Sequence, residues 1–543
     1  MRPDDAFHVY DTTLRDGAQR EGVSYSVADK LAVARLLDDL GVGFIEGGWP
    51  GALPKDTEFF ARARTELTLK SAQLVAFGAT RRPGLAVGDD AQVQALLDAQ
   101  TPVITLVAKS DVRHVIDALR TTLDENLAMV RDTVQYLVGQ DRRVFVDLEH
   151  FFDGYHNDRD YGLRVLEAAA GAGADVAVLC DTNGGLLPLG IHSIVSDIVA
   201  RSGGLRLGIH CQDDTACAVA NTLAAVEAGV THVQCTANGY GERTGNADLF
   251  AVIGNLETKL DRRVLPLGRL PELVRVSHAL AELANIAPDT HQAYVGVSAF
   301  AHKAGLHASA IKISPALYNH LDPTIVGNDM RVLITEMAGR ASIELKGKEL
   351  GYDLAHDREA LGAVVARVKS MEARGYSFEA ADASFELLLR EITEGERRRY
   401  FTVESWRTIV EQRPAGQVVS EATVKVFAKG QRIVATGEGN GPVNALDRAL
   451  RLALEQIFPE LAALELVDYK VRILEGNEGT GAVTRVLVES SDGQGEWVTI
   501  GVHENVIAAS WMALDDAITY GLLRAGRIAD GDDNSGPGTV AGP

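Results

Sequence analysis

The first 260 residues repeat one pattern of hydrophobic and polar positions. Short apolar runs end in polar, often acidic residues, and amphipathic segments lie between them. A short apolar run bounded by polar residues is typical of a buried strand, whereas apolar positions three or four residues apart are typical of a helix. The eight runs predicted as strands are 7–13, 44–50, 71–80, 102–110, 143–150, 175–182, 206–214 and 232–239.

Segment 26–41 shows the helical pattern clearly. Leu31 and Leu37 belong to its apolar face, Ser26 is a suitable N-cap, and Gly41 is a suitable stop. The segment is therefore predicted to be a helix between the first two strands.

Eight strand signals that alternate with helices over about 250 residues predict a (β/α)8 TIM barrel. A doubly wound sheet also alternates, but no G-x-G-x-x-G follows an early run, so a dinucleotide site is unsupported. In a barrel, catalytic residues lie at the carboxyl ends of the strands. The polar residues that follow the runs there are Asp11, Glu46, Glu149, Asp181, Thr182, His210, Asp213 and Asn238.

The pattern of predicted helices and strands changes after the barrel. Helical patterns broken by polar loops dominate at first, and strand patterns at 421–430 and 469–479 then flank a helical pattern at 443–458. The sequence thus predicts an α/β protein in four parts. These are a barrel at 1–270, a helical linker region at 271–395, a small C-terminal α/β domain at 396–525 and a disordered tail at 526–543.

Charge and composition exclude several classes of partner. The 53 Lys and Arg residues against 75 Asp and Glu give a net charge of −22. A nucleic-acid-binding face or an anionic membrane surface calls for the opposite sign, so neither partner is expected. The sequence has no signal-like N-terminus and no apolar run of about 20 residues. The four cysteines form no disulfide framework, so a cytoplasmic location is predicted.

Five motifs occur in a fixed order: DTTLRDG (11–17), EHFFDGY (149–155), CDTNGG (180–185), NGYGERTGNADL (238–249) and SAFAHKAGLHASA (298–310). With them the chain resembles the acyl-CoA:2-oxo-acid condensing enzymes, which include isopropylmalate, homocitrate and citramalate synthases. EGGWPGALPKDTEFF (46–60) is similar to the citramalate synthase branch. The resemblance extends to about residue 525.

The resemblance implies a condensation in which acetyl-CoA loses a methyl proton and attacks the ketone of a 2-oxo acid, after which the thioester is hydrolysed. Pyruvate is the preferred acceptor, which would give citramalate. The cofactor implied is a divalent metal ion that chelates the oxo acid. By position, the implied metal ligands are Asp11, His210, Gln212 and Asn246, and the implied substrate-binding residues are Arg15, Asp16 and Thr182.

The resemblance also implies the catalytic groups. Arg15 would face the ketone oxygen, and Glu149 would act in acid/base steps. His307 and Tyr318, eleven residues apart, match a pair that reaches the site from a partner subunit. An obligate homodimer is therefore expected.

One motif departs from the family pattern at a metal position. The family has H-x-H-N-D, whereas this chain has His210, Cys211, Gln212, Asp213 and Asp214. Residues i and i+2 of a strand face the same side, so Gln212 still faces the site beside His210. An amide oxygen suits a hard cation, so Mg²⁺ or Mn²⁺ is favoured, and Zn²⁺ is the alternative.

Three interpretations follow from this departure. The enzyme runs the family reaction with an altered metal site, it is a paralogue for another 2-oxo acid or acyl-CoA, or it is an impaired protein that binds an effector. Catalysis is favoured because the other motif residues remain, and a lyase is disfavoured by the C-terminal domain. In the family that domain binds an end-product amino acid, isoleucine in the citramalate branch and leucine in the isopropylmalate branch. The alternative is that it only holds the dimer together.

Overall fold

The computed structural model describes residues 6–335, 338–355, 357–414, 416–474 and 481–526. All but the first residue of the predicted tail lies outside these ranges. The chain forms two units, the first made of Met1–Phe300 with Leu321–Met330 and the second of Ala301–His320 with Arg331–Pro543.

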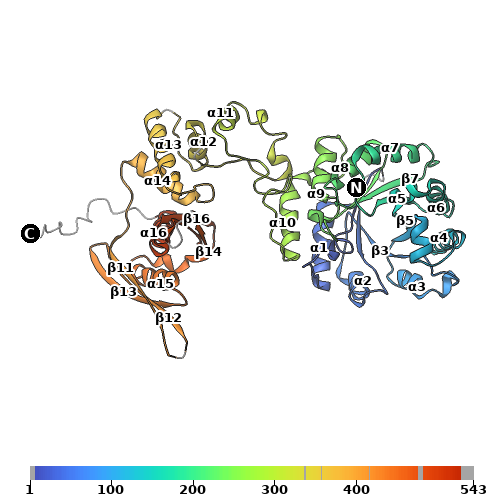
Figure 1. Ribbon diagram of the computed structural model, residues 1–543, viewed down its shortest axis with the longest axis horizontal. Coiled ribbons are helices and arrows are strands. Elements are labelled where there is room, and N and C mark those ends of the chain that lie inside the picture. Colours follow the sequence, from blue (N-terminus) through green and yellow to red (C-terminus); the bar gives the residue numbers. More distant parts are fainter. Residues whose placement is uncertain (1–5, 336–337, 356, 415, 475–480, 527–543) are drawn as a thin grey trace, which may run out of the picture. The chain divides into compact units, whose positions relative to one another are not determined.

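The first unit is a closed barrel of eight parallel strands, which confirms the predicted fold (Figure 1). Each strand pairs with the next along the chain, and β1 closes the barrel against β8 through Asp11 and Cys235. All eight predicted strands are present. They are β1 (His8–Asp11), β2 (Phe44–Gly48), β3 (Gln73–Ala79), β4 (Val103–Lys109), β5 (Arg143–Glu149), β6 (Val176–Asp181), β7 (Arg206–Cys211) and β8 (His232–Cys235).

Helices follow the strands, as predicted for this fold. The first begins and ends where the sequence indicated, because Ser26 and Asp29 form a capping box and Gly41 adopts φ 102° at the C-cap. The helices are α1 (Val27–Leu40), α2 (Pro54–Glu66), α3 (Ala91–Asp98), α4 (Leu123–Val138), α5 (Phe151–Asn157), α6 (Arg159–Gly171), α7 (Pro188–Val199), α8 (Ala218–Glu227), α9 (Leu249–Thr258) and α10 (Leu273–Leu283).

Two apolar layers stabilise the barrel. Inside it, Tyr10, Phe44 and Phe145 pack with smaller strand residues, and outside it the strands bury their other face against the helices. The segment 321–330 also belongs to this unit, since Leu321 and Val326 pack into the same core. The packed interior leaves the ends of the barrel for chemistry.

The second unit combines helices with two antiparallel sheets. Strands β11–β12–β13 form one sheet and β14–β15–β16 the other; α15 packs on the first and α16 on the second. Its elements are β9 (Ala301–His302), α11 (Gly305–Ile313), β10 (Arg331–Val332), α12 (Arg340–Glu349), α13 (Arg358–Glu372), α14 (Asp382–Glu394), β11 (Thr402–Gln412), β12 (Val418–Ala428), β13 (Gln431–Gly439), α15 (Pro442–Leu454), β14 (Glu465–Ile473), β15 (Thr484–Ser491), β16 (Glu496–His503) and α16 (Val506–Arg524).

Helix α16 is long and apolar enough to cross a membrane by length and composition alone. Half of its most apolar stretch is buried inside the protein, where Ala509, Ala513 and Ala517 pack with Val486 and Val488 of β15. Its apolar composition is therefore explained by packing in a domain core.

Candidate active site

The loop after β1 turns back over the carboxyl end of the barrel. The backbone amides of Arg15, Asp16 and Gly17 all donate to the carbonyl oxygen of Thr12, at 3.2, 2.9 and 3.0 Å. This tight turn places the Arg15 and Asp16 side chains together at the strand ends.

Arg15 is held by a buried carboxylate from the next strand. Its Nε donates to Oε2 of Glu46 at 2.6 Å, and its Nη1 donates to Oδ2 of Asp16 at 3.1 Å. Glu46 is fully buried and also accepts from the hydroxyls of Tyr10 and Thr12. Burial alone would lower the pKa of Arg15, but Glu46 and Asp16 raise it, so the guanidinium stays charged.

Asp16 meets His210, Gln212 and Asn246 in one buried cluster. Its Oδ2 lies 3.5 Å from Nε2 of His210, and its Oδ1 accepts from Nδ2 of Asn246 at 3.3 Å. An isolated bridge pairs the backbones of Gln212 and Asn246. Burial would raise the pKa of Asp16, but the Arg15 guanidinium lowers it below its ordinary value, so Asp16 is an anion.

This cluster has the donor atoms that a divalent cation needs. Burial lowers the pKa of His210, which therefore presents a neutral imidazole. Oε1 of Gln212 and Oδ1 of Asn246 are buried without a hydrogen-bond partner. Buried polar atoms are normally satisfied, so two such oxygens beside a carboxylate and an imidazole fit a divalent cation. Across the described residues, no group of three or more His, Cys, Asp or Glu side chains is placed to hold a metal, because amides supply half of this cluster.

Asp11, predicted as a metal ligand, is engaged by Thr13. Its two carboxylate oxygens accept from the amide and hydroxyl of Thr13, at 2.9 and 2.7 Å. Burial raises its pKa to about 7. The structure instead places Asp16, predicted as a substrate-binding residue, beside His210, because the turn after β1 brings the later carboxylate back over the barrel.

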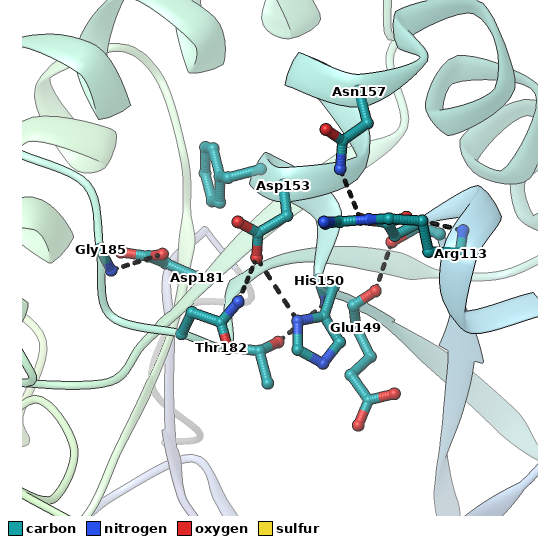
Figure 2. A network of polar contacts seen from close by, with 12 residues as sticks. Arg113, Glu149, His150, Asp153, Asn157, Asp181, Thr182 and Gly185 are labelled. Atoms are coloured by element: carbon teal, nitrogen blue, oxygen red, sulfur yellow. Dashed lines mark hydrogen bonds and ion pairs between the residues drawn. The ribbon is translucent and has the colours of Figure 1, made fainter. Parts of the chain in front are cut away.

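Glu149 ends β5, and Thr182 directly follows the end of the neighbouring β6 (Figure 2). The Glu149 carboxylate contacts the ammonium of Lys109 and points away from the polar network behind it. In that network the amide of His150 donates to Oγ1 of Thr182 at 2.8 Å. His150 adopts φ 57°, a left-handed conformation that turns the chain sharply after Glu149.

Two inward-facing residues of the barrel are not among the predicted site residues. Asp147 lies two positions before Glu149 on β5, and Gln234 lies in the middle of β8; both are buried and bonded to each other. The signal that could have found them is a polar residue inside an otherwise apolar run, because alternate strand residues share a face.

The second unit holds the predicted pair from the linker region. The rings of His307 and Tyr318 stack with centroids 4.1 Å apart. Nε2 of nearby His302 bonds to Oδ1 of Asn319 at 2.7 Å. Tyr318 is 41% exposed, and the neighbouring Leu306 and Leu317 are exposed as well. Within this unit, the pair therefore forms an open, partly apolar surface.

Comparisons with known proteins agree with this architecture. Three family models match consecutive parts of the chain: "HMGL-like" at residues 6–283, "Homocitrate synthase post-HMGL domain-like" at 294–376 and "LeuA allosteric (dimerisation) domain" at 379–522. The first covers the barrel and the last covers both antiparallel sheets.

Curated relatives match over nearly their whole length. An (R)-citramalate synthase of Streptomyces coelicolor is 69% identical over 96% of this chain and 98% of its own. The (R)-citramalate synthases of Synechocystis and Aquifex aeolicus are 49% and 47% identical, over 95% of this chain and 96% and 98% of theirs. With these matches, the chain belongs to the citramalate synthase branch of the 2-isopropylmalate synthase and homocitrate synthase family.

Proposed function

We propose that this chain condenses acetyl-CoA with pyruvate to give citramalate, with a divalent metal ion bound by Asp16, His210, Gln212 and Asn246. The observation that carries the proposal is the buried cluster of these four side chains beside Arg15, in a chain that belongs to the citramalate synthase branch. Asp16 replaces Asp11 as the carboxylate ligand, because Asp11 is bonded to Thr13.

The bond changes follow from the two substrates. The acetyl methyl loses a proton, its carbon bonds to C2 of pyruvate, and the ketone oxygen becomes an alkoxide that takes up a proton. Water then cleaves the thioester C–S bond, which gives the second carboxylate and releases CoA as a thiol. A bound divalent cation would make the ketone more electrophilic without a proton transfer.

The residues of the barrel mouth provide the other requirements. Arg15, fixed by Glu46, offers its guanidinium to the oxygen on which negative charge develops. The Thr182 hydroxyl accepts from the backbone of His150 and keeps its own proton to donate to the pyruvate carboxylate. Glu149 is partly exposed at the end of β5, where it can exchange protons with a bound substrate.

Substrate preference tests this function directly. Thiol release would be followed with acetyl-CoA and pyruvate, 2-oxobutyrate, 2-oxoisovalerate or 2-oxoglutarate, each with Mg²⁺, Mn²⁺ or Zn²⁺. We expect the highest kcat/KM with pyruvate, with citramalate identified by NMR. Release only with a longer acceptor would make the protein a paralogue for that acid, and no release with any acceptor would leave it an effector-binding protein.

We further propose a homodimer in which His307 and Tyr318 complete the partner's site. The match to a dimerisation domain and the exposed, partly apolar surface around this pair support it. Arg15→Ala and His307→Ala would each be inactive alone. Co-expressed, half of the dimers are mixed and each has one intact site, so about a quarter of wild-type activity returns. If both residues act within one chain, the mixed dimers have no intact site and activity stays absent.

The C-terminal domain offers a place for the proposed amino-acid effector. A cavity of about 640 Å³ lies at the start of α15, between that helix and β14. The helix begins at Pro442, after an N-cap Gly441 that supplies no side-chain cap, so the amides of its first turn can donate to a carboxylate. Asp447 is paired with Arg451 of the same lining, so Glu465 supplies the negative charge for an ammonium group, and Leu466 and Tyr469 supply apolar surface. We expect isoleucine to bind here by calorimetry, and Tyr469→Ala to abolish that binding; heat unchanged by this substitution would place the effector elsewhere.

A further inference from the structure

A hydrogen-bonded chain runs from the barrel interior to His210. Nε2 of Gln234 donates to Oδ1 of Asp147 at 2.8 Å, and Oε1 of Gln234 lies 3.0 Å from Nδ1 of His210. All three side chains are buried, with exposed fractions of 4% for Asp147, 1% for Gln234 and 6% for His210. Three strands, β5, β8 and β7, each contribute one member.

The amide of Gln234 fixes which atoms donate and which accept in this hydrogen-bonded series. A glutamine side chain has one oxygen that accepts and one nitrogen that donates. Asp147 engages the nitrogen of Gln234, so the oxygen faces His210 and Nδ1 must carry the imidazole proton. Burial raises the pKa of Asp147 to about 8, and its Oδ1 can accept whether the acid is protonated or ionised.

The far side of the imidazole agrees with this assignment. Nε2 of His210 accepts from Nε2 of Gln212 at 3.4 Å, which requires an unprotonated Nε2. The same atom faces Oδ2 of Asp16 at 3.5 Å. Its lone pair therefore points into the cluster whose two amide oxygens have no partner.

We propose that Gln234 and Asp147 are positioning residues that hold His210 as the Nδ1–H tautomer, so that Nε2 is the atom presented to the cation. The inference rests on the proposed function, because it assigns this nitrogen to the metal placed there. A ligating histidine normally needs such a partner for its other nitrogen, and the loss of that partner typically costs about 10–100-fold in metal affinity. The partner here is the Gln234 amide, and its hydrogen bond to Asp147 keeps that amide from flipping.

Two measurements on the full chain test the proposal. The ¹⁵N spectrum of histidine-labelled, metal-free protein, with the His210 signals assigned from a His210→Gln spectrum, reports the tautomer. We expect an unprotonated Nε2 in the wild type, and a protonated Nε2 there would overturn the proposal whether or not any variant folds.

Calorimetry with Mn²⁺ provides the second measurement. Gln234→Leu removes the acceptor and should weaken Mn²⁺ binding about 10–100-fold, whereas Gln234→Glu keeps an acceptor and should restore most of it. Thr105→Val is the matched control, because Thr105 is equally buried in the barrel and bonds to Tyr10 instead. It should leave the affinity unchanged.

Asp16→Asn separates this inference from the proposed function. If Asp16→Asn weakens Mn²⁺ binding but Gln234→Leu does not, the hydrogen-bonded chain has no positioning role and the metal placement survives. If neither substitution weakens Mn²⁺ binding, the cation binds elsewhere and both proposals fail. Weaker Mn²⁺ binding in both Asp16→Asn and Gln234→Leu, with binding recovered in Gln234→Glu, supports both proposals.

Discussion

Replacing Arg15 with leucine should damage stability and activity for separable reasons. Glu46 is fully buried, and its charged partner is Arg15, whose Nε lies 2.6 Å from Oε2. Without Arg15, Glu46 retains hydroxyl donors from Tyr10 and Thr12 but no countercharge from this side chain. Removing one partner of a buried ion pair destabilises a protein by about 3–5 kcal/mol. The Arg15 side chain is only 15% exposed, so solvent screening reduces this effect little.

The activity loss has a different origin, because the variant also lacks the guanidinium proposed to stabilise the developing alkoxide. Removal of one such donor typically lowers kcat about 10²–10³-fold. Adding Glu46→Gln to Arg15→Leu removes the stranded charge, so stability should return while activity stays low. Stability would be read from hydrogen exchange of amides in β1 and β2 during a urea titration, and activity from CoA release.

A matched surface change completes the experiment. Arg62→Leu removes an exposed arginine that pairs with Glu66 within α2 and should change neither property. If amide hydrogen exchange in β1 and β2 of Arg15→Leu stays at the wild-type level, the buried Glu46 charge is not destabilising and the reasoning is refuted. A double variant that is no more stable than Arg15→Leu would refute the assignment of the loss to Glu46.

Three further predictions concern the cluster and its neighbour. Asp16→Asn should weaken Mn²⁺ binding in calorimetry while Asp11→Asn should not, and the reverse result would return the metal to Asp11. Gln212→His adds an imidazole and should shift preference from Mn²⁺ towards Zn²⁺ in a competition titration; an unchanged preference would mean that residue 212 does not face the cation. Burial raises the pKa of Asp11 to about 7, whereas the unfolded chain releases this proton near pH 4, so this group makes the free energy of unfolding fall as pH rises from about 4 to about 7. Asp11→Asn should therefore gain stability over the wild type in urea at pH 8 but not at pH 4, and an equal difference at both would contradict the shift.

The fold follows from the sequence because the barrel is encoded in local patterns. Each strand is an apolar run, each helix has its own periodicity, and parallel strands in a closed barrel bring their carboxyl ends to one face. Together with the motifs, that rule is enough to predict Arg15, Asp16, Thr182, His210 and Asn246 at the barrel mouth.

The details of the site depend on contacts that no local pattern contains. The choice between Asp11 and Asp16 is made by a turn whose amides converge on Thr12, and both carboxylates lie in the same short motif. The link from Asp147 to Gln234 joins residues 87 positions apart. Long-range side-chain pairing of this kind follows from strand register, which the sequence alone leaves open.

The chain enters the second unit at residue 301, returns to the barrel unit for 321–330 and then leaves again. On a ribosome, the barrel therefore cannot complete its own packing when its eighth strand emerges. It must wait until Val326 is made, which fills a fully buried position, and Asn328, which bonds to the carbonyls of Tyr294 and Gly296 at 2.9 Å. Nascent barrels carry an uncovered apolar site during this interval. A chain stopped at residue 283, where the barrel family model ends, would keep that site open permanently and should bind chaperones or aggregate.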